Sequence, residues 1–344
     1  MRTGPLDRPA GHAARRRGRR TCALLSAALL ALAACGGEGG EGSEAETGTA
    51  GPITLYTCVS DTTIQPVIDA FESRADGAQV ELFRAPTGEL NARVAADARS
   101  GGLRADVIWG CDPLTMQGFV DQGLVGGWTP PEAAAVPGDF RTEDYVGVHV
   151  LYMLAVHRTD APAPEAWSDL ATGGHAVAVP DPSVAASALG ALGWFAEEPG
   201  YGVDFYADLE RNGAVQVSTP NDVTTGVAQG IYDAGITHAN SAYAALEDGS
   251  PIEVVWPDPG AVAIHGPIAL ATDSADSEAA KDFISFVVGE EGQAVVGESG
   301  SYPTRPGAPT PTIPANAPIV FPDWAAIGDD KDAILSEYQQ VFGG

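Results

Sequence analysis

Lysine is almost absent from this 344-residue chain, and positive charge of any kind is scarce in most of it. The chain has 18 basic and 46 acidic residues, of which seven arginines and one aspartate precede Cys35. The remainder therefore has 11 basic and 45 acidic residues, a formal net charge of 11 − 45 = −34. Such a surface repels phosphate backbones and anionic headgroups, which excludes nucleic acid and anionic membrane as partners of the folded part.

Motifs for catalysis and nucleotide binding are missing as well. The sequence has no His-Glu-x-x-His, no Gly-Lys-Ser/Thr phosphate loop and no Gly-x-Gly-x-x-Gly after a strand. The stretch Gly297–Ser301 lacks the final glycine of a hydrolase nucleophile elbow. His149, His157, His175 and His265 are scattered, and each is interpreted as a strand residue. We therefore expect no enzyme, no cofactor and no metal site.

Apolar runs are short, because none reaches the roughly 18 residues that a membrane-spanning helix needs. The run Cys22–Ala34 follows five clustered arginines, and this pattern predicts a signal peptide over 1–34. It ends in Leu-Ala-Ala-Cys, which resembles the lipobox of bacterial lipoproteins. That resemblance implies lipidation of Cys35 and an extracytoplasmic protein anchored to the cell membrane. The alternative is an ordinary signal peptide cleaved nearby, and both Sec and twin-arginine export stay open.

Residues 35–51 contain no large apolar side chain, so they are predicted to form a flexible tether. From Ile53 onward, short apolar runs alternate with amphipathic helices, which is the pattern of an α/β fold. Two long extended stretches, 144–158 and 261–272, are predicted to cross between two lobes. We expect 52–145 and 262–344 to form lobe 1 and 146–261 to form lobe 2, each a mixed sheet flanked by helices, with a cleft between them.

Four stretches resemble the type 2 periplasmic-binding-protein superfamily, and they occur in the expected order: Ala105–Val125, Ala178–Leu189, Asp276–Val296 and Ser301–Gly307. They look most like the ABC-transporter solute receptors grouped with ferric-iron, phosphonate, thiamine and polyamine binders. The resemblance implies a monomer that binds a small polar solute between its lobes by hinge closure and delivers it to a cognate permease and ATPase. It also implies that only the lipid contacts the membrane. A signalling or adhesion lipoprotein with the same fold is the alternative, and an extracellular enzyme is a third.

In open α/β sheets, ligands bind beyond the carboxyl ends of strands, at helix N-termini. Polar residues stand at these points throughout the chain. The candidate ligand-binding residues are Ser60, Asp61, Thr62, Arg84, Thr87, Gly88, Trp109, Asp112, Asp181, Ser183, Ser187, Asn221, Asp222, Asn240, Ser241 and Tyr243. For several of them the alternative role is that of a helix N-cap, which their residue types suit equally well.

The ligand itself stays open between a ferric chelate, an amine and a phosphonate. The ferric receptors of this group supply an adjacent Tyr-Tyr pair, whereas this sequence has a lone Tyr243 at the matching place, so naked ferric ion is not expected. The excess of aspartate near the strand ends favours a cation, with Trp109 and Tyr243 as a cation–π wall. Helix N-termini and hydroxyls would instead suit a phosphonate or a carboxylate.

Two cysteines, Cys58 and Cys111, follow the first and third predicted strands. In lobes of this type those strands are neighbours, about 4.8 Å apart, which places the two thiols within bonding range. Export to an oxidising compartment would permit a disulfide. We therefore predict a Cys58–Cys111 bridge, with two buried free thiols as the alternative.

Overall fold

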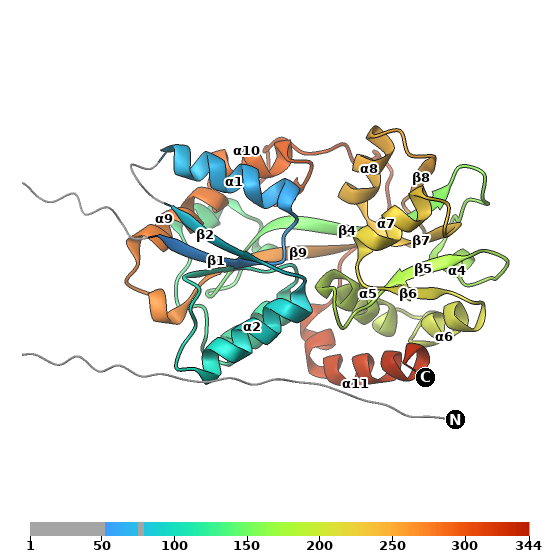
Figure 1. The fold of residues 1–344 in the computed structure, drawn as a ribbon, viewed down its shortest axis with the longest axis horizontal. Helices are drawn as coiled ribbons and strands as arrows, with labels where there is room; N and C mark the ends of the chain where they lie inside the picture. The colour runs from blue at the N-terminus through green and yellow to red at the C-terminus, as the bar shows by residue number, and fades with distance from the viewer. Residues whose placement is uncertain (1–51, 75–78, 344) are drawn as a thin grey trace, which may run out of the picture. The chain divides into compact units, whose positions relative to one another are not determined.

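The computed structural model describes residues 52–74 and 79–343. The predicted signal peptide (1–34), the predicted tether (35–51) and the predicted lipidation site Cys35 lie outside the described residues. Within those two ranges, no helix has the length and apolar character needed to cross a bilayer. The predicted α/β class is confirmed, because strands and helices alternate along the described chain (Figure 1).

The first lobe, on the left in Figure 1, is built on a parallel sheet in the order β2-β1-β3. Leu55 and Val107 in this sheet are fully buried, because helices cover both of its faces. Its elements are β1 (Ile53–Thr57), α1 (Asp61–Arg74), β2 (Val80–Arg84), α2 (Thr87–Arg99), β3 (Val107–Trp109), α3 (Pro113–Asp121), η1 (Pro131–Ala135), η2 (Gly138–Phe140), η3 (Thr272–Ser274), α9 (Glu278–Val288) and α10 (Glu290–Glu298).

The second lobe, on the right in Figure 1, continues the same sheet in the order β7-β5-β6. Its core holds a cluster of aromatic rings around Phe195, which stacks on Phe205 and packs edge-on against Trp167. Its elements are α4 (Trp167–Leu170), β5 (Val177–Pro180), α5 (Ala186–Glu197), α6 (Asp204–Arg211), β6 (Val215–Val217), α7 (Pro220–Ala228), β7 (Ala234–His238), α8 (Ala239–Glu247) and β8 (Ile252–Val255).

Two long antiparallel strands join the lobes, as the sequence predicts. β4 (Val146–Arg158) pairs with β9 (Ala261–Leu270) from Val146 to Met153. β9 also pairs with β3 of the first lobe, and the far end of β4 pairs with β7 and β8 of the second. All ten residues of β9 are buried, because elements of both lobes cover it.

A third segment also passes from the first lobe to the second, which the sequence did not reveal. It runs from α10 through β10 (Tyr302–Pro303) and β11 (Ile319–Val320) to α11 (Trp324–Phe342). α11 lies against α5 and α6, where Tyr338 packs edge-on against Tyr206 at 5.1 Å (Figure 1). The predicted assignment of 262–344 to lobe 1 therefore does not describe α11, and the other predicted boundaries stay predictions.

The Cys58–Cys111 disulfide is present, with the two Cα atoms 6.0 Å apart. The bridge forms because β1 and β3 are adjacent parallel strands, with Thr57 opposite Trp109, and each cysteine follows its strand by one or two residues. It closes a loop with a sequence separation of 53 residues. The disulfide therefore fixes the ends of two strands relative to one another.

Replacement of both cysteines by serine is expected to lower the free energy of unfolding by up to about 4 kcal/mol, since the open chain regains the entropy of the loop. Urea denaturation of the oxidised protein and of the double variant measures the difference. A reductant should lower the stability of the parent protein and leave that of the variant unchanged. Equal stabilities would contradict a stabilising role for the bridge.

Candidate functional site

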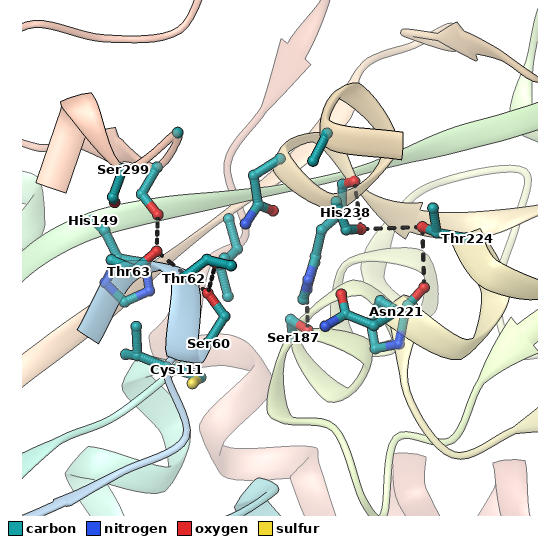
Figure 2. Close-up of a pocket in the computed structure, with 18 of the residues that line it drawn as sticks. Ser60, Thr62, Thr63, Cys111, His149, Ser187, Asn221, Thr224, His238 and Ser299 are labelled. Atoms are coloured by element: carbon teal, nitrogen blue, oxygen red, sulfur yellow. Dashed lines mark hydrogen bonds between the residues drawn. The ribbon is translucent and has the colours of Figure 1, made fainter. Parts of the chain in front are cut away.

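A cavity of about 1060 Å³ lies between the two lobes and is lined by both. In the close-up of Figure 2, Ser60, Thr62 and Thr63 lie on one side of the cavity and Ser187, Asn221 and Thr224 lie on the other. Both cysteines of the disulfide also line the cavity, and they belong to its first-lobe wall. Polar side chains thus meet at the ends of strands, as the sequence predicts for this type of sheet.

The structure brings most of the predicted residues together at this cavity. Their common feature is a position directly before a helix, within its first two turns, or at the end of β2. The predicted residues that line the cavity are Ser60, Asp61, Thr62, Arg84, Thr87, Ser187, Asn221, Asp222, Asn240, Ser241 and Tyr243.

Trp109 and Asp112 lie away from the cavity, contrary to the prediction, and both are fully buried. Trp109 packs in the first-lobe core beside Val107, and its indole Nε1 donates to His149 Nδ1 at 3.1 Å. Asp112 is the N-cap of α3 and accepts from the Thr115 amide at 2.8 Å. Removal of the Trp109 ring would leave a hole in the core, so a Trp109 variant does not test solute binding.

Asp181, Ser183 and Gly88 also lie outside the cavity lining. The Asp181 carboxylate accepts from both the amide and the hydroxyl of Ser183, which closes a turn before α5. Gly88 lies where the lobes touch, and its amide donates to the Val184 carbonyl at 3.2 Å. A β-carbon on Gly88 would lie 3.1 Å from the Ser183 carbonyl oxygen, so glycine permits this close contact.

Hydroxyl groups dominate the first-lobe wall at the N-terminus of α1. Ser60 Oγ lies 2.9 Å from Thr62 Oγ1, and Thr63 Oγ1 lies 2.7 Å from Ser301 Oγ of the segment after α10. Arg84, the one basic residue of the lining, donates to the Val59 carbonyl and pairs with Asp61 at 3.4 Å. The charge of Arg84 is therefore already matched within this wall.

Two helix N-termini without side-chain caps open onto the second-lobe wall. Neither α5 nor α8 has a capping side chain at its first turn, and Ser187 of α5 is hydrogen-bonded to His238, the residue before α8, at 2.7 Å (Figure 2). The first amides of a helix have no partner within it and carry partial positive charge. This wall therefore presents N–H groups suited to an anion.

The third helix of that wall, α7, is capped by its own residues. Thr219 and Asp222 form a capping box, so the Asp222 carboxylate accepts from the Thr219 amide and hydroxyl. The side chains of Asn221 and Asn240 line the cavity and form no hydrogen bond with any described residue. They are free to bind a solute, as both donors and acceptors.

The structure adds lining residues that sequence reasoning missed, among them His149, His238, Ser299 and Ser301. Burial lowers the pKa of His149 to about 3 and that of His238 to about 4, so both are neutral donors or acceptors at neutral pH. His238 ends β7 directly before α8, which was the available signal. The serines follow α10, in the stretch Gly297–Ser301 that the sequence analysis considered only as a nucleophile elbow.

Side chains of the types that ligate metals are scattered among the residues that the structure describes. No group of three or more His, Cys, Asp or Glu side chains is gathered there in a way that would hold a metal ion. Tyr243, which the sequence analysis compared with the tyrosine pair of the ferric receptors, accepts a hydrogen bond from Trp256 Nε1 at 2.9 Å. The lone tyrosine thus already has a partner within the second lobe.

Comparison with known proteins gives a consistent picture. Residues 53–301 match the family described as bacterial extracellular solute-binding protein. The spermidine/putrescine-binding periplasmic protein of Salmonella typhimurium is 29% identical over 124 residues, which span 33% of this chain and 35% of that relative. The chain thus matches about a third of the length of this curated relative.

Solved structures share the fold at low sequence identity. The periplasmic binding protein AfuA from Actinobacillus pleuropneumoniae, with bound fructose-6-phosphate, superposes with a TM-score of 0.77 at 18% identity, over 85% of this chain and 98% of that one. Iron-bound HitA from Pseudomonas aeruginosa gives 0.74 at 19% identity, over 84% and 99%. These similarities establish a two-lobed binding-protein fold.

His265, buried between Phe140 and Trp324, offers a test of the buried neutral histidines. Burial lowers the pKa of His265 to about 4, so between pH 6.5 and 4 the unfolded chain binds a proton that the folded protein does not. Stability from this group is present above pH 6.5 and is lost as pH falls. As pH falls through that window, the free energy of unfolding of His265→Phe should rise relative to that of the parent protein by up to about 1.4 kcal/mol per pH unit.

Urea denaturation of both proteins at several pH values measures the difference between their free energies of unfolding. The general charge effects of an acidic chain cancel in this difference. Asp112, whose pKa burial raises to about 6, titrates equally in both proteins and cancels too. A stability difference that does not change with pH would mean that His265 titrates alike in the folded and unfolded states.

Proposed function

The chain belongs to the family of bacterial extracellular solute-binding proteins, and on that premise we propose that it is the solute receptor of an ABC importer. In this proposal the protein works outside the cytoplasm as a monomer and is held at the cell membrane by lipid on Cys35. A cognate permease recognises the solute-loaded form, and an ATPase drives uptake. The protein itself performs no catalysis.

We further propose that the solute carries an oxyanion group, such as a phosphonate, a phosphate or a carboxylate. The observation that carries this proposal is the pair of uncapped N-termini of α5 and α8, joined by Ser187 and His238, at the second-lobe wall. Helix amides bind oxyanions without a basic side chain. A ferric chelate whose ligands present carboxylates fits the same wall.

An amine is less well supported by the charges around the cavity. Asp61 is paired with Arg84, and Asp222 accepts hydrogen bonds from Thr219, so both carboxylates already have partners. The other acidic residues of the lining, Glu247, Asp248 and Glu298, are exposed at the C-terminal ends of α8 and α10. The proposed cation–π wall also lacks Trp109, which lies in the core.

The placement of the lining groups supports binding by hinge closure. The α1 hydroxyls belong to the first lobe, and the uncapped helices belong to the second. A solute that contacts both walls favours the conformation in which they are close, and this shifts the open–closed equilibrium. The direct contact of Gly88 with Val184 supports a conformation in which the lobes already meet on one side of the cavity.

Ser187→Ala and Asn221→Ala are expected to weaken solute binding by about tenfold or more, since a hydrogen bond to a charged group contributes about 1.5–3 kcal/mol. Calorimetric titration with inorganic phosphate, methylphosphonate, ferric citrate and spermidine identifies the class of solute. Ser183→Ala is the matched control, because Ser183 bonds only within its own turn and lies outside the cavity. Binding of spermidine alone, at equal affinity in all variants, would refute the proposed oxyanion site.

A further inference from the structure

The third segment that passes between the lobes contains a stretch with an unusual composition. Residues 306–317, which we call the strap, include four prolines, Pro306, Pro309, Pro311 and Pro314. Proline fixes one backbone dihedral and removes the amide hydrogen, so the strap is stiff and forms few backbone hydrogen bonds. The strap residues Pro309, Thr310 and Pro311 line the solute cavity.

The strap is firmly held at both of its ends. Before it, Thr304 Oγ1 donates to the Gly147 carbonyl at 2.7 Å, and the Arg305 amide donates to Gln293 Oε1 at 3.0 Å. Gln293 is fully buried and also donates to the Val148 carbonyl at 2.8 Å. After the strap, β11 pairs with β9, and the Ala261 amide donates to the Pro318 carbonyl at 2.9 Å.

Between these ends, the strap has one close backbone contact with a helix, and Ile313 packs against the apolar cluster around Ile252. Within the described chain, its backbone bonds are local: the Ala308 amide donates to Arg305 and the Ala317 amide to Pro314. The Pro309 carbonyl rests directly on Gly297 of α10, and a β-carbon at Gly297 would overlap that carbonyl. Gly297 is buried, so the strap depends on the absence of a side chain there.

We propose that the strap sets how far the lobes open at rest, and that its contact with Gly297 fixes this setting. A stiff segment attached to α10 in one lobe and to β11 in the other limits their relative rotation. The point at which Pro309 contacts α10 determines the effective length of the strap. The consequence for solute affinity rests on the proposed function, whereas the limit on opening does not.

The Gly88 amide reports lobe opening from a different part of the cavity. It donates across the lobes to the Val184 carbonyl, and α2, which contains Gly88, has no capping side chain at its first turn. Its hydrogen therefore exchanges with solvent whenever the lobes separate. Neither Gly88 nor Val184 belongs to the strap or to α10.

Gly297→Ala tests the proposal by displacing the strap without weakening α10, because alanine favours a helix more than glycine does. Amide hydrogen exchange of the solute-free protein, resolved by NMR, should become faster by about threefold or more at both Ala308, whose amide donates to the Arg305 carbonyl directly before Pro309, and Gly88. Gly118→Ala is the matched control: Gly118 is a helical glycine of α3 with open space where its β-carbon would be, and exchange should be unchanged.

Faster exchange at Ala308 with unchanged exchange at Gly88 would overturn the proposal, because the strap would then be only a local structure. Unchanged exchange at both amides would overturn it as well. Should Gly297→Ala fail to fold, the double variant Pro309→Gly, Pro311→Gly loosens the strap without adding atoms and must also speed exchange at Gly88. Since no solute is present, a failed test leaves the oxyanion proposal untouched, and a failed titration leaves the strap untouched.

Discussion

The ladder between β4 and β9 is the constraint on which the rest of this structure depends. Together these two strands join the sheets of both lobes, because β9 pairs with β3 of the first lobe and β4 pairs with β7 and β8 of the second. Buried along its whole length, β9 cannot shift without exposing apolar surface in both cores. Bending of this ladder, together with the third crossing segment, therefore determines the width of the cavity.

The polar character of the cavity follows from the direction of the strands around it. Parallel strands of each lobe end at the cavity, and the helices that follow them begin there, at α1 in one lobe and at α5, α7 and α8 in the other. Unpaired amides and short hydroxyl side chains gather at such helix starts. The same burial that shapes the walls keeps His149 and His238 neutral, so in the proposed function the walls would recognise solute through hydrogen bonds and helix dipoles.

Much of this arrangement was predictable from the sequence, and the misses have physical causes. The residues that follow β1 and β7 were correctly predicted to line the cavity. A polar residue between an apolar strand and a helix is placed at the edge of the sheet and not in the core. Trp109 was misplaced because a strand directs alternate side chains to opposite faces, and the sequence does not say which face is the core. Val107 and Trp109 share one face and one core cluster, while Ile108 lies on the other.

The placement of α11 was beyond sequence reasoning for a related reason. An apolar stripe such as that of Ile334 and Tyr338 indicates a buried helix face but does not indicate the surface that buries it. Only the structure places that stripe on α5 and α6. This placement also explains why the proline-rich segment before α11 must reach the second lobe.

Native mass spectrometry of the protein, purified without added solute, tests the central claim most directly. The account predicts a retained small molecule that bears a phosphonate, phosphate or carboxylate group, present in the parent protein and depleted in Ser187→Ala. A polyamine retained equally by both proteins would contradict it.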